Sequence, residues 1–123
     1  EPRNTVPETI EGMEKVVAPL KTKLPVSKIL LLGIFPRGKT ADDPQRVQVN
    51  AINAALPRLA DNEQVFFLDI GNQFLSADGT ISPEIMPDYL HPNERGYRIW
   101  ADAIDAPLQA LLRGEKPALP RRD

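Results

Sequence analysis

The stretch Lys28-Ile29-Leu30-Leu31-Leu32-Gly33-Ile34-Phe35 is a continuous apolar run that ends at Pro36. It is too short for a typical helix and does not alternate with polar residues, which favours a strand buried on both faces. A second apolar run covers residues 64–70 and stops at Gly71. Strands buried on both faces are typical of parallel sheets. The two runs therefore predict an α/β protein with a parallel sheet.

Amphipathic helices are expected before, between and after the two strands. Thr5 and Glu8 have the spacing of a capping box, so the first helix should begin there, and Pro19 should end or kink it. Asp43 and Pro44 suit the start of the second helix. Three apolar faces follow from the three- and four-residue spacing. They are Ile10, Met13, Val17, Leu20 and Leu24; Val49, Ile52, Leu56 and Leu59; and Tyr97, Trp100, Ala101, Ile104, Leu108 and Leu111.

The third helix is expected to start near residues 92–94 and to end before Gly114, a plausible left-handed C′ residue. Helices that alternate with buried strands indicate an α/β parallel sheet. Two parallel strands alone would both be edge strands, so the pattern corresponds to half of a sheet. We expect residues 1–114 to be part of one domain and residues 115–123 to be a flexible tail.

The composition excludes several classes of function. A net charge of −2 gives no basic surface for nucleic acid. With no cysteine and one histidine a zinc site is not expected, although a carboxylate site for Mg²⁺ or Ca²⁺ stays open. No apolar run is long enough to span a membrane, and no signal peptide is recognisable. Because the chain starts at Glu1, we expect a processed chain or a fragment, and a secreted or periplasmic location stays open.

His91 is the only histidine, and its unperturbed pKa lies near neutrality. Asp88 precedes it by three residues, so one tight turn would bring the carboxylate to the ring Nδ1. Such a pair can act as a general base with its orienting acid. The same spacing is typical of a surface helix start with an exposed histidine, and taken alone it favours that interpretation.

Serine nucleophiles are not evident. Ser27, Ser76 and Ser82 lie in turns or at the wrong end of a strand, without a Gly-x-Ser-x-Gly elbow. Asp69, at a strand end, is expected to accept from loop amides rather than to act as an acid. Trp100 is expected in the core. Arg37 fits either a cleft for an anionic group or a solvated loop.

Ligands of open α/β sheets bind outside the carboxyl ends of the strands. These ends are residues 35–38 and 69–71. The loop with Asp88 and His91 enters the last helix, whose start should lie at the same edge. We therefore expect His91, Arg37 and Phe35 to line one cleft.

Three segments in order resemble the SGNH hydrolases, the GDSL-type esterase superfamily. Residues 28–38 resemble the fourth-strand segment, and residues 67–71 are similar to the last-strand segment. Met86-Pro87-Asp88-Tyr89-Leu90-His91-Pro92, followed by Gly96-Tyr97 and Trp100-Ala101, resembles the final block. The likeness is nearest to bacterial relatives of the platelet-activating factor acetylhydrolase catalytic subunits.

The resemblance implies a flavodoxin-like three-layer fold with a five-stranded parallel sheet, of which this chain would carry two strands and three main helices. It implies a cofactor-free serine esterase for short acyl or acetyl esters, including acetylated carbohydrates, and it permits homodimers. His91 would be the catalytic base and Asp88 its orienting acid. Phe35, Arg37, Tyr89 and Leu90 would line the substrate pocket.

The sequence departs from the family in its N-terminal blocks. The Gly-Asp-Ser block with the nucleophile is absent, as are the blocks with the oxyanion-hole glycine and asparagine. Asn4 could stand for that asparagine, but Pro2 occupies the position where the asparagine block needs glycine. We therefore expect the chain to match the C-terminal part of the domain, to be inactive alone, and to need the nucleophile half as its partner. The alternative is a non-catalytic binding or assembly module.

Overall fold

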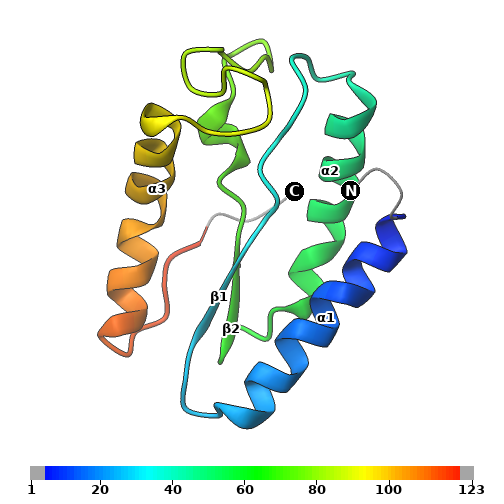
Figure 1. The fold of residues 1–123 in the computed structure, drawn as a ribbon. Helices are drawn as coiled ribbons and strands as arrows, with labels where there is room; N and C mark the ends of the chain where they lie inside the picture. Colours follow the sequence, from blue (N-terminus) through cyan, green and yellow to red (C-terminus); the bar gives the residue numbers. More distant parts are fainter. Residues whose placement is uncertain (1–4, 120–123) are drawn as a thin grey trace.

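The computed structural model describes residues 5–119, so Asn4 and the end of the predicted tail lie outside the described residues. Strands β1 (Ile29–Leu32) and β2 (Val65–Leu68) pair in parallel, with Ile29 opposite Val65 and Leu32 opposite Leu68. Helices α1 (Val6–Lys23) and α2 (Pro44–Ala55) cover one face of this sheet, and α3 (Glu94–Leu112) covers the other (Figure 1). Short 3₁₀ helices η1 (Leu56–Leu59) and η2 (Gly71–Phe74) follow α2 and β2. The predicted α/β order is confirmed.

Helix α1 begins at the predicted capping box. The Glu8 N–H donates to the Thr5 hydroxyl at 3.2 Å, and the Thr5 N–H donates to the Glu8 carboxylate at 3.1 Å. The prediction for Pro19 is wrong in one respect, because the helix continues to Lys23. Pro19 lies on the exposed side of α1, where water can satisfy the carbonyl that loses its helical partner.

The predicted face of α1 holds from Ile10 to Val17, which is 6% exposed, and is wrong for Leu20 and Leu24. Ile10 is 1% exposed and packs with Ile52 and Leu56, whereas Leu20 and Leu24 are 39% and 50% exposed. The apolar side chains that α1 contributes to this cluster all come from its first two turns, Val6 to Met13. The end of the predicted stripe therefore remains on the surface.

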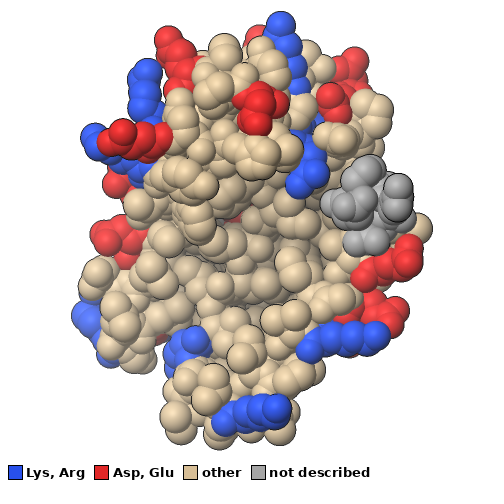
Figure 2. Space-filling view, in the orientation of Figure 1, with Lys and Arg blue, Asp and Glu red and all other residues tan. Residues whose placement is uncertain are grey.

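Strand β1 corrects the expectation of a strand buried on both faces. All four of its residues are half-buried, and it is shorter than the apolar run in the sequence. The reason is that, among the described residues, β1 has a strand neighbour on one side only. Figure 2 shows the molecule from the side of the free β1 edge, and this face is uncharged and hollowed at its centre, with charged residues around its rim.

Just after β1, the backbone is hydrogen-bonded by a buried asparagine side chain of α2. Asn53 is 4% exposed; its Oδ1 accepts from the Ile34 N–H at 2.8 Å and its Nδ2 donates to the Ile34 carbonyl at 2.7 Å. One side chain thus replaces both hydrogen bonds that a neighbouring strand would make with Ile34. This arrangement satisfies both backbone groups of Ile34 just beyond the end of β1.

Arg46 of α2 is a buried cation that sequence reasoning missed. It is 2% exposed, and each of its three guanidinium nitrogens donates to a backbone carbonyl: Nε to Arg37 at 3.0 Å, Nη1 to Gly79 at 2.7 Å, and Nη2 to Gly38 at 2.6 Å. Burial lowers the pKa of Arg46, and the nearby Asp43 carboxylate opposes that shift. The guanidinium therefore holds the loop after β1 against the turn at residues 76–80.

Helix α3 confirms part of the predicted stripe, because Trp100 and Ile104 pack against the core cluster that contains Phe74. Tyr97 and Leu108 are 52% and 38% exposed, whereas Gly96, Pro107 and Ala110 are buried. The buried face therefore also includes Gly96, Pro107 and Ala110, each one position before a residue of the predicted stripe. At the other end, Gly114 has a φ of +76°, with its N–H on the Leu111 carbonyl at 3.0 Å and the Glu115 N–H on Ala110 at 2.9 Å. The predicted C′ role of Gly114 is confirmed.

Residues 115–119 run back from α3 toward β2 (Figure 1). Lys116 pairs with Glu63 at 2.8 Å, and Leu119 packs against the core cluster that contains Leu68, Ile70 and Phe74. Residues 120–123 of the predicted flexible tail lie outside the described residues. Among the described helices, none is long and apolar enough to cross a membrane.

Replacing the buried guanidinium should destabilise the protein strongly. In Arg46→Met three backbone carbonyls lose their donors, so the free energy of unfolding should fall by about 3 kcal/mol, at about 1 kcal/mol per bond. Urea unfolding measures this loss. Arg58→Met is the matched control, because Arg58 is exposed on η1, and its effect should stay within about 0.5 kcal/mol. Equal losses in the two variants would show that Arg46 does not hold the loops.

Candidate active site

The loop that carries Asp88 and His91 is closed by one residue, Asn93. Its N–H donates to the Ile85 carbonyl at 2.9 Å, and its Nδ2 donates to the Glu84 carbonyl at 2.8 Å. Its Oδ1 accepts from the Gly96 N–H at 3.1 Å and so caps α3. Both ends of the loop are therefore fixed to the first turn of the helix.

Gly96 lets this loop lie close to α3. A Cβ at this position would be 2.7 Å from the Ile85 carbonyl oxygen and 2.8 Å from the Pro92 Cβ. Neither neighbour is the end of a flexible side chain, so a larger residue would push the loop away. The close packing of this loop on α3 therefore explains why a glycine precedes Tyr97.

Asp88 and His91 meet as their spacing predicts. Asp88 Oδ2 lies 2.6 Å from His91 Nδ1. Asp88 Oδ1 accepts from the N–H groups of Leu90 at 3.0 Å and His91 at 2.7 Å. Tyr89 takes the left-handed conformation, with a φ of +58°, which closes the tight turn. The carboxylate is therefore fixed by the backbone before it orients the ring.

The electrostatics of this pair define the proton positions. The hydrogen bond from the His91 ring, followed by the backbone bonds, lowers the pKa of Asp88 to about 2. Asp88 is thus an acceptor at neutral pH, and a carboxylate in that position favours the ring form with its hydrogen on Nδ1. The lone pair then lies on Nε2, and 74% of the His91 side chain is exposed. The ring can accept a proton from a group that approaches from outside.

The loop after β1 lies against the Asp88–His91 loop, as strand order suggested. The Gly38 N–H donates to the Tyr89 carbonyl at 2.9 Å, while Arg46 holds the carbonyls of Gly38 and Arg37. The Nε of Arg37 is buried and has no hydrogen-bond partner among the described residues. Arg37 is therefore neither fully solvated nor fully satisfied.

The other candidate pocket residues differ in how far they are buried. Phe35 is half-buried in an aromatic cluster, with its ring 4.8 Å from Phe74 and 5.3 Å from Trp100. Tyr89 packs against the same core cluster, and Leu90 is 38% exposed. Trp100 lies in the core as predicted, but its buried Nε1 has no partner among the described residues.

The remaining polar candidates are structural. Ser82 Oγ accepts from the Glu84 N–H at 3.1 Å, and Asp69 Oδ1 accepts from the Gly71 N–H at 2.8 Å, so both expected turn roles are confirmed. Ser76 lies in a turn in which its carbonyl accepts from the Gly79 N–H at 2.9 Å. Within residues 5–119, no group of three or more histidine, cysteine and acidic residues could hold a metal ion.

Comparison with known proteins identifies the family. Residues 2–99, which include the Asp88–His91 loop, match the GDSL-like Lipase/Acylhydrolase family. The chain belongs to this family of acylhydrolases. The match confirms the SGNH resemblance drawn from the three sequence segments.

Relatives of this GDSL-like chain include platelet-activating factor acetylhydrolase IB subunits. It is 37% identical over 112 residues to subunit alpha2 from Rattus norvegicus and 31% identical over 110 residues to subunit alpha1 from Homo sapiens. Each alignment covers 89% of this chain but only 46% and 47% of the relatives. The chain thus spans about half the length of the curated relatives it matches.

A solved structure confirms the fold. A Streptococcus pneumonia protein named for platelet activating factor superposes with a TM-score of 0.69 at 23% sequence identity. The superposition covers 81% of the GDSL-like chain and 50% of the solved one. At this identity the likeness supports the fold alone. That fold is the partial SGNH architecture predicted from the sequence.

The pKa of Asp88 should depend on the His91 ring. In His91→Ala the pKa should rise from about 2 toward the ordinary 3.8 and stay below it, because the two backbone bonds remain. Because the folded-state value is depressed, this stabilisation is complete above about pH 4 and is lost as the pH falls toward 2. Carboxyl ¹³C NMR titration measures the shift. Asp78, whose pKa is lowered by Thr80, should not respond. An unchanged Asp88 would contradict the pairing.

Proposed function

We propose that Asp88 and His91 are the acid and base of a Ser–His–Asp triad in an esterase that hydrolyses short-chain acyl esters. The observation that carries this proposal is the 2.6 Å bond from His91 Nδ1 to a carboxylate with a lowered pKa. The bond leaves Nε2 as the proton acceptor. Membership of an acylhydrolase family and the short-acyl chemistry in the name of the acetylhydrolase relatives support it.

Each residue has a defined step in this reaction. A serine hydroxyl attacks the ester carbonyl while His91 Nε2 takes its proton, and Asp88 stabilises the resulting imidazolium. The tetrahedral intermediate then expels the alcohol, which receives that proton from Nε2. Water repeats the sequence on the acyl-enzyme and releases the acid, so the triad returns to its starting state. The proposed reaction needs no metal or cofactor.

The nucleophile would come from a segment outside this chain that pairs with the free edge of β1. The uncharged, hollowed face over this edge supports that position (Figure 2). The buried donors of Arg37 and Trp100 add to the argument, because both flank Phe35 just beyond β1 and lack partners among the described residues. An unsatisfied buried donor costs about 1–3 kcal/mol, so both side chains should move and find partners when a segment docks. The nucleophile half of the same domain is the proposed partner, and this chain alone should be inactive.

The substrate class is proposed to be small acetyl esters, including acetylated carbohydrates. Phe35, Arg37, Tyr89 and Leu90 are the proposed pocket residues. The bond from Gly38 to the Tyr89 carbonyl supports this grouping, because it brings the two loops that carry these residues together. The half-buried Arg37 would lie beside the polar part of the ester.

Triad variants test the esterase proposal in the complete protein. Hydrolysis of p-nitrophenyl acetate should fall by about 10³–10⁴-fold in His91→Ala and in Asp88→Asn, because the base or its orienting acid is lost. Asp102→Asn is the matched control; Asp102 is exposed on α3, and its variant should keep the parent rate. A His91→Ala rate within a few-fold of the parent would refute the assignment.

A fluorophosphonate probe separates the esterase from a non-catalytic module. The complete protein should be labelled at one serine, and His91→Ala should be labelled far more slowly. Labelling identifies the segment that supplies the nucleophile. A folded complete protein that takes no label would favour the binding or assembly module instead.

A further inference from the structure

A second hollow lies on the outer side of the sheet, away from the Asp88–His91 pair. It follows β2 and has a volume of about 830 Å³, within the range of small-molecule pockets. One wall comes from α2 and η1, and the other from η2 and residues 116–119. None of the proposed catalytic or ester-binding residues lines it. The lining residues that matter to the argument are Asn50, Phe67, Asp69, Asn72, Gln73 and Lys116.

The backbone of β2 cannot accept another strand along this hollow. Gln64 and Leu68 present their carbonyls to β1, so by alternation Val65 and Phe67 present theirs outward. Val65 is already engaged, since its N–H donates to Asp61 at 2.9 Å and its carbonyl accepts from Asn62 at 3.0 Å. Phe67 alone remains within the strand, too little for an added peptide strand. The occupant should therefore be a compact molecule.

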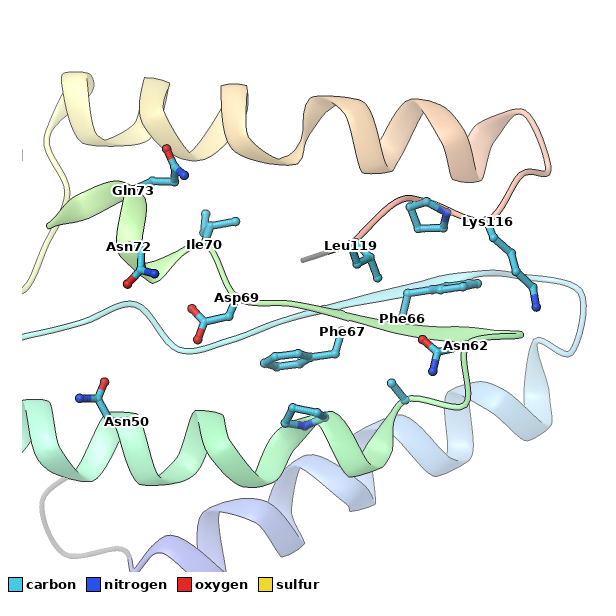
Figure 3. A pocket seen from close by; sticks show the side chains of 13 residues that line it. Asn50, Asn62, Phe66, Phe67, Asp69, Ile70, Asn72, Gln73, Lys116 and Leu119 are labelled. Atoms are coloured by element: carbon cyan, nitrogen blue, oxygen red, sulfur yellow. The ribbon is translucent and has the colours of Figure 1, made fainter. Parts of the chain in front are cut away.

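The hollow is lined by amide side chains that are free to bind. Within residues 5–119, the side-chain amides of Asn50, Asn72 and Gln73 form no hydrogen bond, and all three residues are exposed. Each amide offers both a donor and an acceptor. Figure 3 shows the side chains of Asn50, Asp69 and Asn72 directed into the space between β2 and α2, beside the ring of Phe67.

The charges around the hollow do not select an ion. Lys116 is paired with Glu63 at 2.8 Å. The Asp69 carboxylate is held by the Gly71 N–H at 2.8 Å, which fixes its orientation and partly offsets its charge. What remains is one oriented carboxylate, several neutral amides and an aromatic ring. Hydroxyl groups, which both donate and accept, match such a set, and a ring with an apolar face can lie on Phe67.

From these contacts we infer that the hollow along β2 is an accessory binding site for a neutral polyhydroxylated ligand, a sugar ring. Asn50 and Asn72 bind its hydroxyl groups, Asp69 accepts from them, and Phe67 packs against its apolar face. The inference is independent of the proposed esterase function, because the site shares no residue with the Asp88–His91 pair.

Ligand-observed NMR tests this site on the complete protein. Saturation transfer is measured to D-glucose and to N-acetyl-D-glucosamine, each at millimolar concentration. Transfer to at least one sugar is expected in the parent protein, and it should fall at least five-fold in Asn50→Ala and in Asn72→Ala. Both residues are exposed and their amides unbonded, so the variants should fold normally, as circular dichroism would show.

The matched control is Gln45→Ala. Gln45 is an exposed amide residue on the same helix as Asn50 but does not line the hollow, so its variant should bind as the parent does. His91→Ala should also retain binding. Absence of transfer to both sugars would overturn the inference. Equal transfer in Asn50→Ala and Gln45→Ala, or loss in His91→Ala alone, would overturn it as well, because the sugar would then bind elsewhere.

Discussion

The buried guanidinium of Arg46 is the constraint on which the site end of the molecule depends. Three carbonyls from two loops, those of Arg37, Gly38 and Gly79, converge on one planar cation inside the protein. A buried charge is tolerated only when it is hydrogen-bonded, so the two loops and the cation stabilise one another. Gly38 also donates to the Tyr89 carbonyl. The position of the Asp88–His91 loop thus follows from a side chain that takes no part in the proposed chemistry.

The Asp88–His91 pair is preformed, although its surroundings are open. Asn93 and Gly96 fix the loop, and two backbone N–H groups fix the carboxylate, so the histidine is oriented without help from a substrate. The same ring is 74% exposed. Serine esterases do their chemistry in a shielded site, where fixed dipoles act more strongly than in water. The combination of a rigid pair and an open environment agrees with the proposal that another segment covers the site.

The two edges of the sheet differ in whether a further strand can pair with them. On the β2 side, the turn at residues 61–65 takes up the outward backbone groups of Val65, and amide side chains line the space beyond. On the β1 side, the exposed face is uncharged, and the strand is only half-buried (Figure 2). These differences support the two proposals above, a further strand beside β1 and a small polar ligand on the β2 side. The alignment covers only 46% of the alpha2 relative, which agrees with the proposal of a further strand beside β1.

Local spacing was enough to predict the helices, the strand segments and the contact between Asp88 and His91. The capping box at Thr5 and Glu8, Gly114 at the end of α3 and the contact of Asp88 with His91 involve residues a few positions apart, and each strand is a short continuous run. Tertiary structure alone decided the burial of Arg46 and Asn53, the hydrogen-bonded end of β1 at Ile34, and the face that α3 turns to the core. Those features need partners from distant loops, and helical periodicity cannot indicate that a polar residue will be buried when its partners are backbone carbonyls.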